Sequence, residues 1–553
     1  MKEPTAGEPT KEPCLRSCGY DAAVVRTGDR SRRAIDGLGG IAGVAALAVI
    51  IVVACVEAVH LVRARTYPAE DAAILMRYAA NFAAGHGITF NPGHHAVDGA
   101  TDFGLMLMLA ALIKAGLSAS GAVLVLDVVA HLVTVVVVYV TAQRVVRASV
   151  AVSVVAAGVV ALGPGMFYAQ SRYGTQVFAC AVAVTWALAI WAERLPSRTT
   201  FRWFAIAGLV TGLIRPEGVI VFVLAAVALA LRLDRQRRRL LLRAIFIFFV
   251  PAGAAYFAFH WAYFGYPLPN PFYKKSGGRL HTDGVREAVR FMVTWVAPVA
   301  VLYVLALRRR WRVAAFHAIP VAGFALAWIL LSNETNYINR FQYPLLVMIA
   351  LSLPPLWEAA KEDYPEVDGR AVVAAGAVGV LALALLFARG YRKSVREAAP
   401  GARNSLFTVA KNLRDIPGRH RIAVTEAGLL PFYSGWTTLD LWGLNDEAIA
   451  HHGLSAADID RFQPDVMMIH WAPDSFLQGW HAMNETAVQW AVSHNYILVA
   501  NYGTSGDNTH MYFVRPGSLA TAITAAVRVS PYYLPFNGPG TTKAVPDRAA
   551  PHP

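Results

Sequence analysis

The chain has 553 residues, of which 56% are hydrophobic and only 16% are charged. Soluble domains usually carry about 25% charged residues, so this composition excludes a string of soluble domains and predicts a polytopic membrane protein. The formal net charge of +14 does not indicate nucleic-acid binding, because the arginines are clustered between apolar segments, as the positive-inside rule requires.

The N-terminal residues 1–36 are polar, mixed in charge and rich in Gly, Pro and Thr. This composition predicts a disordered cytoplasmic tail. The apolar run from Leu38 to Leu61 is too long for a signal peptide, so we expect it to be a retained first span. Four cysteines, two in the tail and two in apolar runs, predict neither a disulfide framework nor a metal site: Cys14, Cys18, Cys55 and Cys180.

The transmembrane domain is predicted to cover residues 37–388, including an outer loop over 62–118. In that loop the short apolar run 103–117 is expected to lie along the interface instead of crossing the membrane. Ten further apolar runs follow, which with the first make eleven predicted spans: roughly 119–142, 148–168, 175–193, 202–214, 217–232, 241–263, 290–307, 313–331, 343–357 and 371–388.

The basic clusters orient these spans. With eleven crossings and a cytoplasmic N-terminus, every strong cluster falls on the cytoplasmic side. These clusters are Arg144/Arg147, Arg194/Arg198/Arg202, Arg235–Arg239 and Arg308–Arg312. We therefore predict a multi-pass protein of the inner (cell) membrane, with membrane lipid as a partner and with residues 389–553 outside the cytoplasm.

The C-terminal region is predicted to contain a small α/β domain over residues 389–535. Strand-like runs such as Arg421–Val424 and Asp465–Ile469 alternate with helical stretches. Residues 536–553 are rich in Pro and of low complexity, which predicts a disordered tail.

The same topology gathers polar side chains at the outer face. Carboxylates, amides and cations that are far apart in the sequence fall together there: Glu70, Asp71, Arg77, Asn81, His86, Asn91, Arg215, Glu217, Asn270, Tyr273, Lys274, Lys275, Glu334 and Arg340. The predicted cytoplasmic loops carry positive charge without a comparable mixture. This convergence favours chemistry at the outer face.

A transferase at that face needs a donor anchored in the lipid, because nucleotides are scarce outside the cytoplasm. A polyprenyl-phosphate sugar fits, with its phosphate bound by Arg215, Lys274, Lys275 and Arg340. A carboxylate within hydrogen-bond reach would accept the proton of the attacking hydroxyl, and the cations would stabilise the leaving phosphate. We expect no certain cofactor; a divalent metal has no supporting ligand pattern in the sequence.

Each motif also has a simpler interpretation. The two acids can be a solvated flank, Arg77 can reach the headgroups, and Arg215 with Glu217 can be a structural ion pair. Lys274 and Lys275 can bind anionic lipid. A metal site at His86, His94 and His95 has no fixed ligand spacing, because the loop that carries them is rich in glycine. Asp98 and Asp102 can hold a metal or orient an acceptor, although structural turn roles are favoured for both.

The stretch EDAAILMRYAANFAAGHGITFNPG, residues 70–93, resembles the first outer loop of GT-C membrane glycosyltransferases. It is most similar to the branch containing mycobacterial arabinofuranosyltransferases that use decaprenyl-phosphoryl-arabinose. RPEG at 215–218, YFGYPLPNPFYKK at 263–275, NRFQYP at 339–344, EAGLLPFYSG at 426–435 and DLWGLND at 440–446 also resemble family landmarks. The residues of the first loop that match are Asp71, Ile74, Arg77, Asn81, Gly85, Gly87, Phe90, Asn91 and Gly93.

The resemblance covers about residues 38–515 and implies the GT-C fold and an inverting transfer from a polyprenyl-phosphate sugar to a glycan or glycoconjugate. It implies an outer-loop carboxylate as base, for which Asp71 is preferred over Glu70. It also suggests substrate contacts at Arg77, Asn81, His86, Asn91, Glu217, Asn270, Tyr273 and Glu334.

The sequence departs from the family pattern at three places. Glu70 replaces an Asp, Tyr173-Gly174-Thr175 replaces a Met-Glu-Thr step, and Ser332-Asn333-Glu334 replaces a Gly-Gly-Asp. These departures leave the sugar open: arabinofuranose is the first prediction, and mannosyl or another hexosyl transfer is the next. A carrier of lipid-linked sugars and a non-catalytic subunit of glycan assembly are the alternatives from other functional classes.

Overall fold

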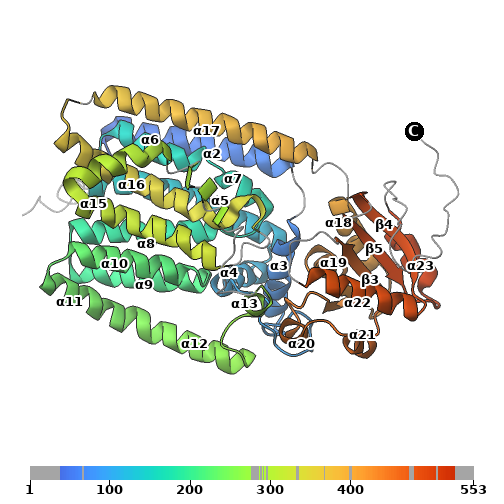
Figure 1. Cartoon of the computed structure of the whole chain (residues 1–553). Helices are drawn as coiled ribbons and strands as arrows, with labels where there is room; N and C mark the ends of the chain where they lie inside the picture. The colour runs from blue at the N-terminus through green and yellow to red at the C-terminus, as the bar shows by residue number, and fades with distance from the viewer. Residues whose placement is uncertain are drawn as a thin grey trace, which may run out of the picture.

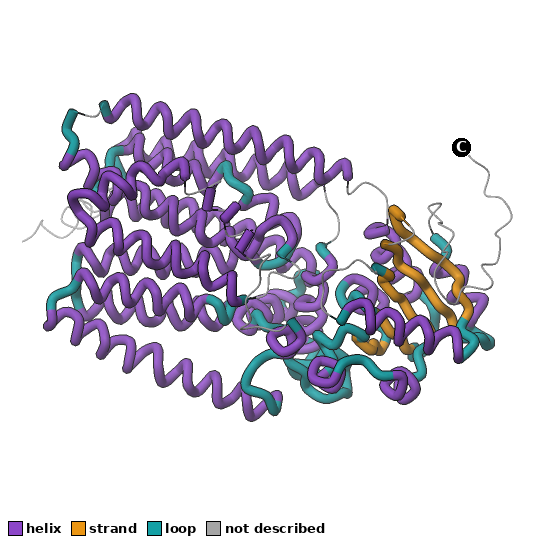
Figure 2. The backbone as a smooth tube through the Cα atoms, in the orientation of Figure 1, coloured by secondary structure: helices purple, strands orange, loops and turns teal. Residues whose placement is uncertain are grey.

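The computed structural model consists of a long helical bundle with a small sheet domain at one end (Figure 1). The structure describes residues 38–64, 68–275, 285–286, 289–290, 292–293, 297–331, 336–366, 368–397, 402–472, 479–505 and 508–529. Figure 2 shows that all the strands lie in the sheet domain and that the bundle is helical.

The helices of the bundle run along its length. They are α2 (Gly40–Ala64), α5 (Ala119–Val140) continued by η1 (Thr141–Val146), α6 (Val150–Ala161), α7 (Gly165–Ser171), α8 (Thr175–Arg194), α9 (Arg198–Ile214), α10 (Gly218–Arg232), α11 (Arg235–Ala244) continued through η2 (Ile245–Phe249) into α12 (Val250–Phe264), α15 (Ala297–Leu330), α16 (Tyr343–Asp363) and α17 (Gly369–Glu397). The last of these extends nine residues beyond the predicted domain end at 388.

Among the described residues, six helical segments are long and apolar enough to cross a membrane: Ala119–Val146, Val150–Ser171, Thr175–Arg194, Arg235–Phe264, Leu302–Leu330 and Arg340–Asp363. Gly40–Val56, Gly218–Arg232 and Gly369–Ala382 are shorter apolar helices of the bundle. The predicted multi-pass helical architecture is confirmed. Its orientation in the membrane stays a prediction.

Two predicted spans, 290–307 and 313–331, fall largely on the single helix α15. Its backbone leaves helical geometry at Arg310 (φ −130°, ψ 51°), inside the basic cluster expected to form the loop between them. The Arg310 guanidinium donates to Asp363 at 2.9 and 3.1 Å and contacts Glu362 at 2.6 Å. These contacts hold the kink against the end of α16, so a sharp bend takes the place of the expected loop.

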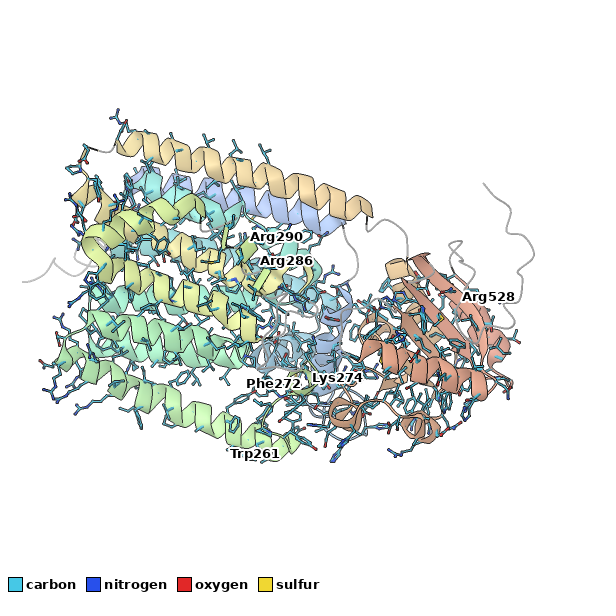
Figure 3. All side chains as sticks on the ribbon, viewed as in Figure 1. Trp261, Phe272, Lys274, Arg286, Arg290 and Arg528 are labelled. Atoms are coloured by element: carbon cyan, nitrogen blue, oxygen red, sulfur yellow. The ribbon has the colours of Figure 1, made fainter. Side chains whose placement is uncertain are left out.

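The surface of the bundle is apolar over much of its length. Phe246 of η2 and Trp261 of α12 are exposed aromatic residues. Figure 3 shows Trp261 at the outer edge of the bundle. Large apolar side chains exposed in this way indicate contact with lipid. At the centre, Trp186 of α8 stacks on Phe316 of α15 with ring centroids 4.9 Å apart.

Two short helices connect the first span to the rest of the bundle, α3 (Glu70–Ala83) and α4 (Phe103–Lys114). With 12 residues, α4 is too short to cross a hydrocarbon layer of ~30 Å, as predicted for this segment. Both helices lie at the end of the bundle that faces the sheet domain (Figure 1).

The C-terminal domain has a mixed five-stranded sheet of order β2-β1-β3-β5-β4. β1 (Arg421–Val424) pairs in parallel with β2 (Thr437–Asp440) and β3 (Val466–Trp471), whereas β5 (Asn508–Val514) is antiparallel to β3 and β4 (Ile497–Ser505). The helices of the domain are α18 (Ala402–Arg414), α19 (Leu429–Ser434), α20 (Glu447–His452), α21 (Ala456–Phe462), α22 (Trp480–Ser493) and α23 (Ala520–Val527). The two strands predicted from the sequence, at 421–424 and 465–469, correspond to β1 and β3.

Alternate residues of each strand face different cores. On β3, Met467 and Ile469 pack into a core with Met483 and Ala487 of α22. Val466 and Met468 face the opposite side, where the apolar core includes Leu406 of α18 and continues into the bundle. The second face of the sheet is therefore the one that joins the domain to α3.

Candidate active site

The loop after α3, which is predicted to face outward, folds back on itself through glycines in the left-handed region. Gly85, Gly87 and Gly93 have φ values of 85°, 78° and 79°, a backbone conformation that side chains other than glycine rarely adopt. Asn81 ties the turn to α3, since its amide donates to the carbonyls of Thr89 (2.8 Å) and Phe90 (3.0 Å). The glycine pattern of the sequence therefore has a local structural cause.

The end of α12 anchors the other part of this loop. Asp98 lies 2.6 Å from Nε2 of His260, and both side chains are buried. The backbone N–H of Asn270 donates to the Asp98 carbonyl at 3.0 Å, and the Tyr263 hydroxyl accepts from the N–H of Ile88 at 3.2 Å. Asp98 thus ties this loop to α12, and the structural role favoured for it from the sequence stays a prediction.

A cluster of five charged side chains lies beside the start of α3; we call it the charged cluster. It contains Asp71, Asp102, Arg215, Glu217 and Arg340. Arg340 lies 3.8 Å from the Asp71 carboxylate, and Arg215 lies 3.6 Å from Asp102 and 3.1 Å from Glu217. Burial raises the pKa of Asp102, an effect that Arg215 opposes. The fold thus brings together cations from positions 215 and 340 with acids from the outer loop.

Aromatic rings hold the two arginines of the cluster. The Arg340 guanidinium lies 3.5 Å from the ring centroid of Tyr173, and Arg215 lies 5.3 Å from the ring of Phe341. A planar guanidinium on an aromatic face keeps its N–H donors directed sideways, which suits a phosphate or carboxylate. Asp71 keeps 25% of its side-chain surface exposed, so the cluster is open to a substrate.

Tyr173-Gly174 is one of the places where the sequence departs from the family pattern. Gly174 has φ +70°, and a Cβ there would lie 2.0 Å from a methyl carbon of Leu105 on α4. An acidic side chain at this position would therefore strain the backbone and displace Leu105. The preceding Tyr173 supplies the ring under Arg340 instead, a contact that no sequence spacing could reveal.

Glu70 has partners different from those of its neighbour Asp71. Its carboxylate accepts the backbone N–H of Gly428 at 2.6 Å and that of Leu429 at 3.0 Å, both at the start of α19 in the sheet domain. A Cβ at Gly428 would lie 1.9 Å from the Glu70 carbonyl oxygen, so the two backbones are in direct contact. Burial, followed by repulsion from Glu426, raises the pKa of Glu70 well above its ordinary value.

Arg77 crosses the same junction. Its guanidinium donates to the carbonyls of Phe90 (2.7 Å) and Trp436 (2.9 Å), to Oδ1 of Asn91 (2.9 Å) and to the carbonyl of Pro431. Burial lowers its pKa to about 10, so the side chain remains charged at neutral pH. These donors hold the outer loop to the sheet domain, which differs from the predicted substrate contact.

Asn91 completes this junction, which we call the seam. Its amide donates to the carbonyl of Thr438 at 2.8 Å, and its Oδ1 accepts the N–H of Thr438 at 3.0 Å, in the pattern of one more β-ladder step. Arg77 and Asn91, two residues of the resemblance, and Glu70, which departs from it, thus build the seam between loop and sheet domain.

The remaining predicted residues lie elsewhere. Lys274 and Tyr273, on α13 (Asn270–Lys274), pack against the sheet domain: the Lys274 ammonium lies 4.3 Å from the ring of Trp442, and Tyr273 lies 4.5 Å from the ring of His451. Figure 3 shows Lys274 between bundle and sheet domain.

Four further predicted residues complete the set. Asn270 is buried, Lys275 is half-buried, and His86 is exposed on the loop. Glu334 lies outside the described residues.

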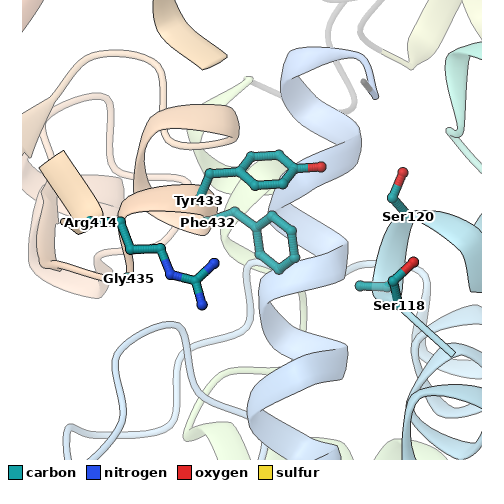
Figure 4. A pocket seen from close by; sticks show the side chains of 7 residues that line it. Ser118, Ser120, Arg414, Phe432, Tyr433 and Gly435 are labelled. Atoms are coloured by element: carbon teal, nitrogen blue, oxygen red, sulfur yellow. The ribbon is translucent and has the colours of Figure 1, made fainter. Parts of the chain in front are cut away.

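A pocket of about 340 Å³ also lies between the bundle and the sheet domain (Figure 4). Its lining mixes hydroxyls, a guanidinium and aromatic rings: Ser118, Ala119, Ser120, Arg414, Phe432, Tyr433 and Gly435. α19 supplies both Phe432 and the Pro431 carbonyl that Arg77 binds, so the pocket is part of the junction between the two domains.

Two residues of this region were not among the predicted site residues: Asp102 of the charged cluster, and Tyr173, whose ring lies under Arg340. For Asp102 a turn role was favoured, and Tyr173 was noted only as a departure from the family pattern. The sequence signal for Asp102 was its place just before an apolar run on the predicted outer face. Its pairing with Arg215, however, depends on α4 packing against α9.

The fold matches that of solved membrane proteins. ArnT from Cupriavidus metallidurans bound to undecaprenyl phosphate superposes with a TM-score of 0.56 at 13% identity, covering 86% of this chain and 98% of that chain. The apo state of the same protein gives a TM-score of 0.57 at 16% identity, covering 87% of this chain and 99% of that chain.

Sequence comparison adds less. Residues 395–514 match a family model described as a domain of unknown function (DUF8728). No curated protein matches the sequence. At 13% and 16% identity, the likeness to the solved structures shows the fold alone. The chain has the predicted GT-C fold with a C-terminal sheet domain.

Proposed function

We propose that this chain is a membrane glycosyltransferase, which moves a sugar with inversion from a polyprenyl-phosphate donor to a glycan or glycoconjugate acceptor. The observation that carries the proposal is the charged cluster at the end of a GT-C bundle, in which a partly exposed carboxylate, Asp71, lies beside Arg340, while Arg215 pairs with Asp102. The fold likeness to a protein solved with undecaprenyl phosphate supports a lipid-phosphate donor. We place the reaction on the outer face of the membrane.

The proposed chemistry assigns each member of the cluster one task. Asp71 accepts the proton of the acceptor hydroxyl as its oxygen attacks the anomeric carbon of the sugar. The bond from that carbon to the phosphate oxygen breaks, and its electron pair stays on the leaving phosphate. Arg340 and Arg215 stabilise this charge, and their aromatic supports keep them oriented before the reaction begins.

Asp102 and Glu217 neutralise part of the positive charge of Arg215 in the absence of donor. Without them two guanidinium groups would be held near each other in a largely buried site, which costs free energy. Lys274 and Lys275 are proposed to extend the positive surface toward the sheet domain and to attract the donor phosphate. Glu70 holds the seam, which leaves Asp71 as the proposed base.

The proposed sugar is arabinofuranose, on the resemblance of the loop at 70–93, and mannose or another hexose is the second candidate. A panel of polyprenyl-phosphate donors with these sugars, presented in liposomes with the purified full chain, identifies the donor by the mass of the product. Transfer from none of the donors, with the protein folded and acceptor glycans of several classes present, would contradict the proposal.

The role of Asp71 is tested by Asp71→Asn in the same assay. We expect a loss of transfer of about 10²–10⁴-fold, the usual contribution of a general base. The matched control is Asp234→Asn, because Asp234 caps α11 and asparagine caps helices equally well. An Asp71→Asn protein that transfers at the wild-type rate would remove Asp71 as base.

A further inference from the structure

A group of metal-ligating side chains lies in the sheet domain, outside the charged cluster. Glu426 follows β1, His470 lies on β3 and His510 lies on β5. One carboxylate oxygen of Glu426 lies 2.8 Å from Nδ1 of His470, and the other lies 3.1 Å from Nε2 of His510. One ligand atom from each of the three residues can be chosen so that all three lie within 4.8 Å of one another.

The sheet itself brings the two imidazoles together. His470 and His510 are direct partners in the antiparallel register of β3 and β5, so their side chains leave the same face of the sheet. Their ring centroids are 4.6 Å apart. This is the face that packs toward α18, α19 and α3.

The segment after β1 brings in the carboxylate. The N–H of Thr425 donates to the Met468 carbonyl at 3.1 Å, and the Thr425 hydroxyl accepts the N–H of His470 at 2.7 Å. These bonds continue the parallel pairing beyond the end of β1 and fix Glu426 beside His470. Ligands of α/β proteins commonly bind at this carboxyl edge of parallel strands.

We propose that Glu426, His470 and His510 form a binding site for a divalent metal ion of the zinc class. Two imidazoles and one carboxylate, with a fourth position left for water, are a common ligand set for zinc. Zinc–ligand bonds of about 2.0–2.1 Å in a tetrahedron place neighbouring ligand atoms roughly 3.3 Å apart. The separations between the Glu426 oxygens and the two imidazole nitrogens, 2.8 and 3.1 Å, are close to that value, and one ligand atom from each residue lies within 4.8 Å of the others.

The charges around the site also favour a dication. Glu426 and Glu70 are both carboxylates in a largely buried region, where each repels the negative charge of the other. A divalent ion between two neutral imidazoles would balance these two negative charges. The Tyr512 hydroxyl, two residues along β5 from His510 on the same face, is buried without a hydrogen-bond partner among the described residues. A water on the metal would give it one.

The position of this metal site links it to the seam. Gly428 and Leu429, whose N–H groups bind Glu70, follow Glu426 by two and three residues. A metal ion that fixes Glu426 to β3 and β5 would therefore fix the start of α19 and hold the N-terminus of α3, which carries Asp71. The metal takes a structural part here, and the proposed transfer chemistry does not depend on it.

The alternative is a hydrogen-bonded triad, in which two neutral histidines donate to Glu426 without any metal. The double variant His470→Asn, His510→Gln separates the two interpretations. The amide nitrogens replace Nδ1 and Nε2 as donors to Glu426, but amides are poor zinc ligands. His481→Gln is the matched control, because His481 is an exposed histidine that also pairs with a glutamate, Glu485, at 3.2 Å.

The test measures metal bound by the purified full chain in detergent. Bound metal is first removed with a chelator, and the protein is then incubated with zinc. Gel filtration removes unbound zinc, and elemental mass spectrometry measures the zinc that remains bound. We expect about one zinc per chain in the wild type and the His481→Gln protein, and at least a roughly 100-fold weaker affinity in the double variant.

Two results would overturn the site. One is a wild-type chain that retains no zinc, cobalt, nickel or manganese after gel filtration. The other is a folded double variant that binds zinc as tightly as the wild type. If the double variant fails to fold, cobalt on the wild-type chain decides: the intense visible bands of tetrahedral Co²⁺ are expected, and their absence would contradict the proposed site.

Discussion

Glu70 and Asp71 are adjacent in the sequence, yet they belong to two different regions of the molecule. Asp71 lies in the charged cluster, 3.8 Å from Arg340 and partly exposed. Glu70 lies in the seam, where it accepts two backbone N–H groups of the sheet domain. Successive side chains on an α-helix point about 100° apart, so one turn of α3 can serve both regions.

The comparison shows how a single motif can serve both chemistry and assembly. In the seam, the side chains of Arg77 and Asn91 form hydrogen bonds with backbone groups of the sheet domain. Every residue type other than proline offers such N–H and C=O groups. In the charged cluster the partners are other charged side chains, and one carboxylate stays accessible. We expect changes in the cluster to affect transfer and changes in the seam to affect stability.

After Asp71→Asn, the largest effect is expected at Arg340. Arg340→Gln removes the cation beside Asp71 and should lower the transfer rate by about 10²–10³-fold, because preplaced charge at the leaving group is lost. Initial rates with saturating donor and acceptor measure it. Arg309→Gln is the control, since Arg309 is exposed beside the kink of α15. Equal rates for Arg340→Gln and wild type would exclude Arg340 from the site.

Arg77 tests the seam. Arg77→Ala leaves buried carbonyls without donors and should destabilise the fold by roughly 3 kcal/mol, with faster amide exchange over residues 402–472. Thermal unfolding and hydrogen exchange measure the two effects. Arg421→Ala, which removes an exposed arginine of the same domain, should change little. Unchanged stability in Arg77→Ala would contradict the assignment of Arg77 to the seam as a residue that stabilises the fold.

The sheet side of the seam carries a pH-dependent group. Burial, opposed by hydrogen bonds from Asn445 and Gly443, raises the pKa of Asp440 from 3.8 to about 6. The folded state then binds the proton more tightly than the unfolded state. The stabilisation from this group is fully present below pH 3.8 and is lost as the pH rises to about 6, a change of up to about 3 kcal/mol.

Asp440→Asn should remove this dependence. The midpoint of thermal unfolding, followed from pH 4 to 7, should fall less with rising pH in the variant than in the wild type. Asp415→Asn, at an exposed position, should keep the wild-type profile. Parallel profiles for wild type and Asp440→Asn would show that Asp440 does not titrate in this range.

The smallest of these effects is expected for the contact of Glu70 with α19. Glu70→Ala removes the acceptor of two backbone N–H groups and should cost about 1–3 kcal/mol of unfolding free energy. Denaturation in mixed detergent measures the change. A stability loss well above this range would mean that Glu70 holds more than the start of α19.

Much of the fold could be predicted because it depends on local patterns. Apolar runs located the helices of the bundle, and the length of 103–117 indicated that α4 does not cross the membrane. The alternating runs at Arg421–Val424 and in β3 indicated the sheet. The kink at Arg310 could not be predicted, because it depends on ion pairs with Glu362 and Asp363, the last two residues of α16.

The candidate site was predictable in part. Topology alone put Asp71, Arg215 and Arg340 on one face, and the structure brings all three into one cluster. The docking partners of Glu70 and Arg77 lie more than 350 residues further along the chain, where no sequence spacing connects them. The same holds for His470 and His510, which meet only through the strand register.

The most direct test of the account compares Asp71→Asn with Glu70→Gln in one transfer assay, with the polyprenyl-phosphate donor found for the wild type. The two variants remove the same charge one residue apart. We predict that Glu70→Gln transfers within a few-fold of the wild type, whereas Asp71→Asn loses about 10²–10⁴-fold. The reverse order, or equal losses in two folded proteins, would contradict the assignment of Asp71 as base and Glu70 as a seam residue.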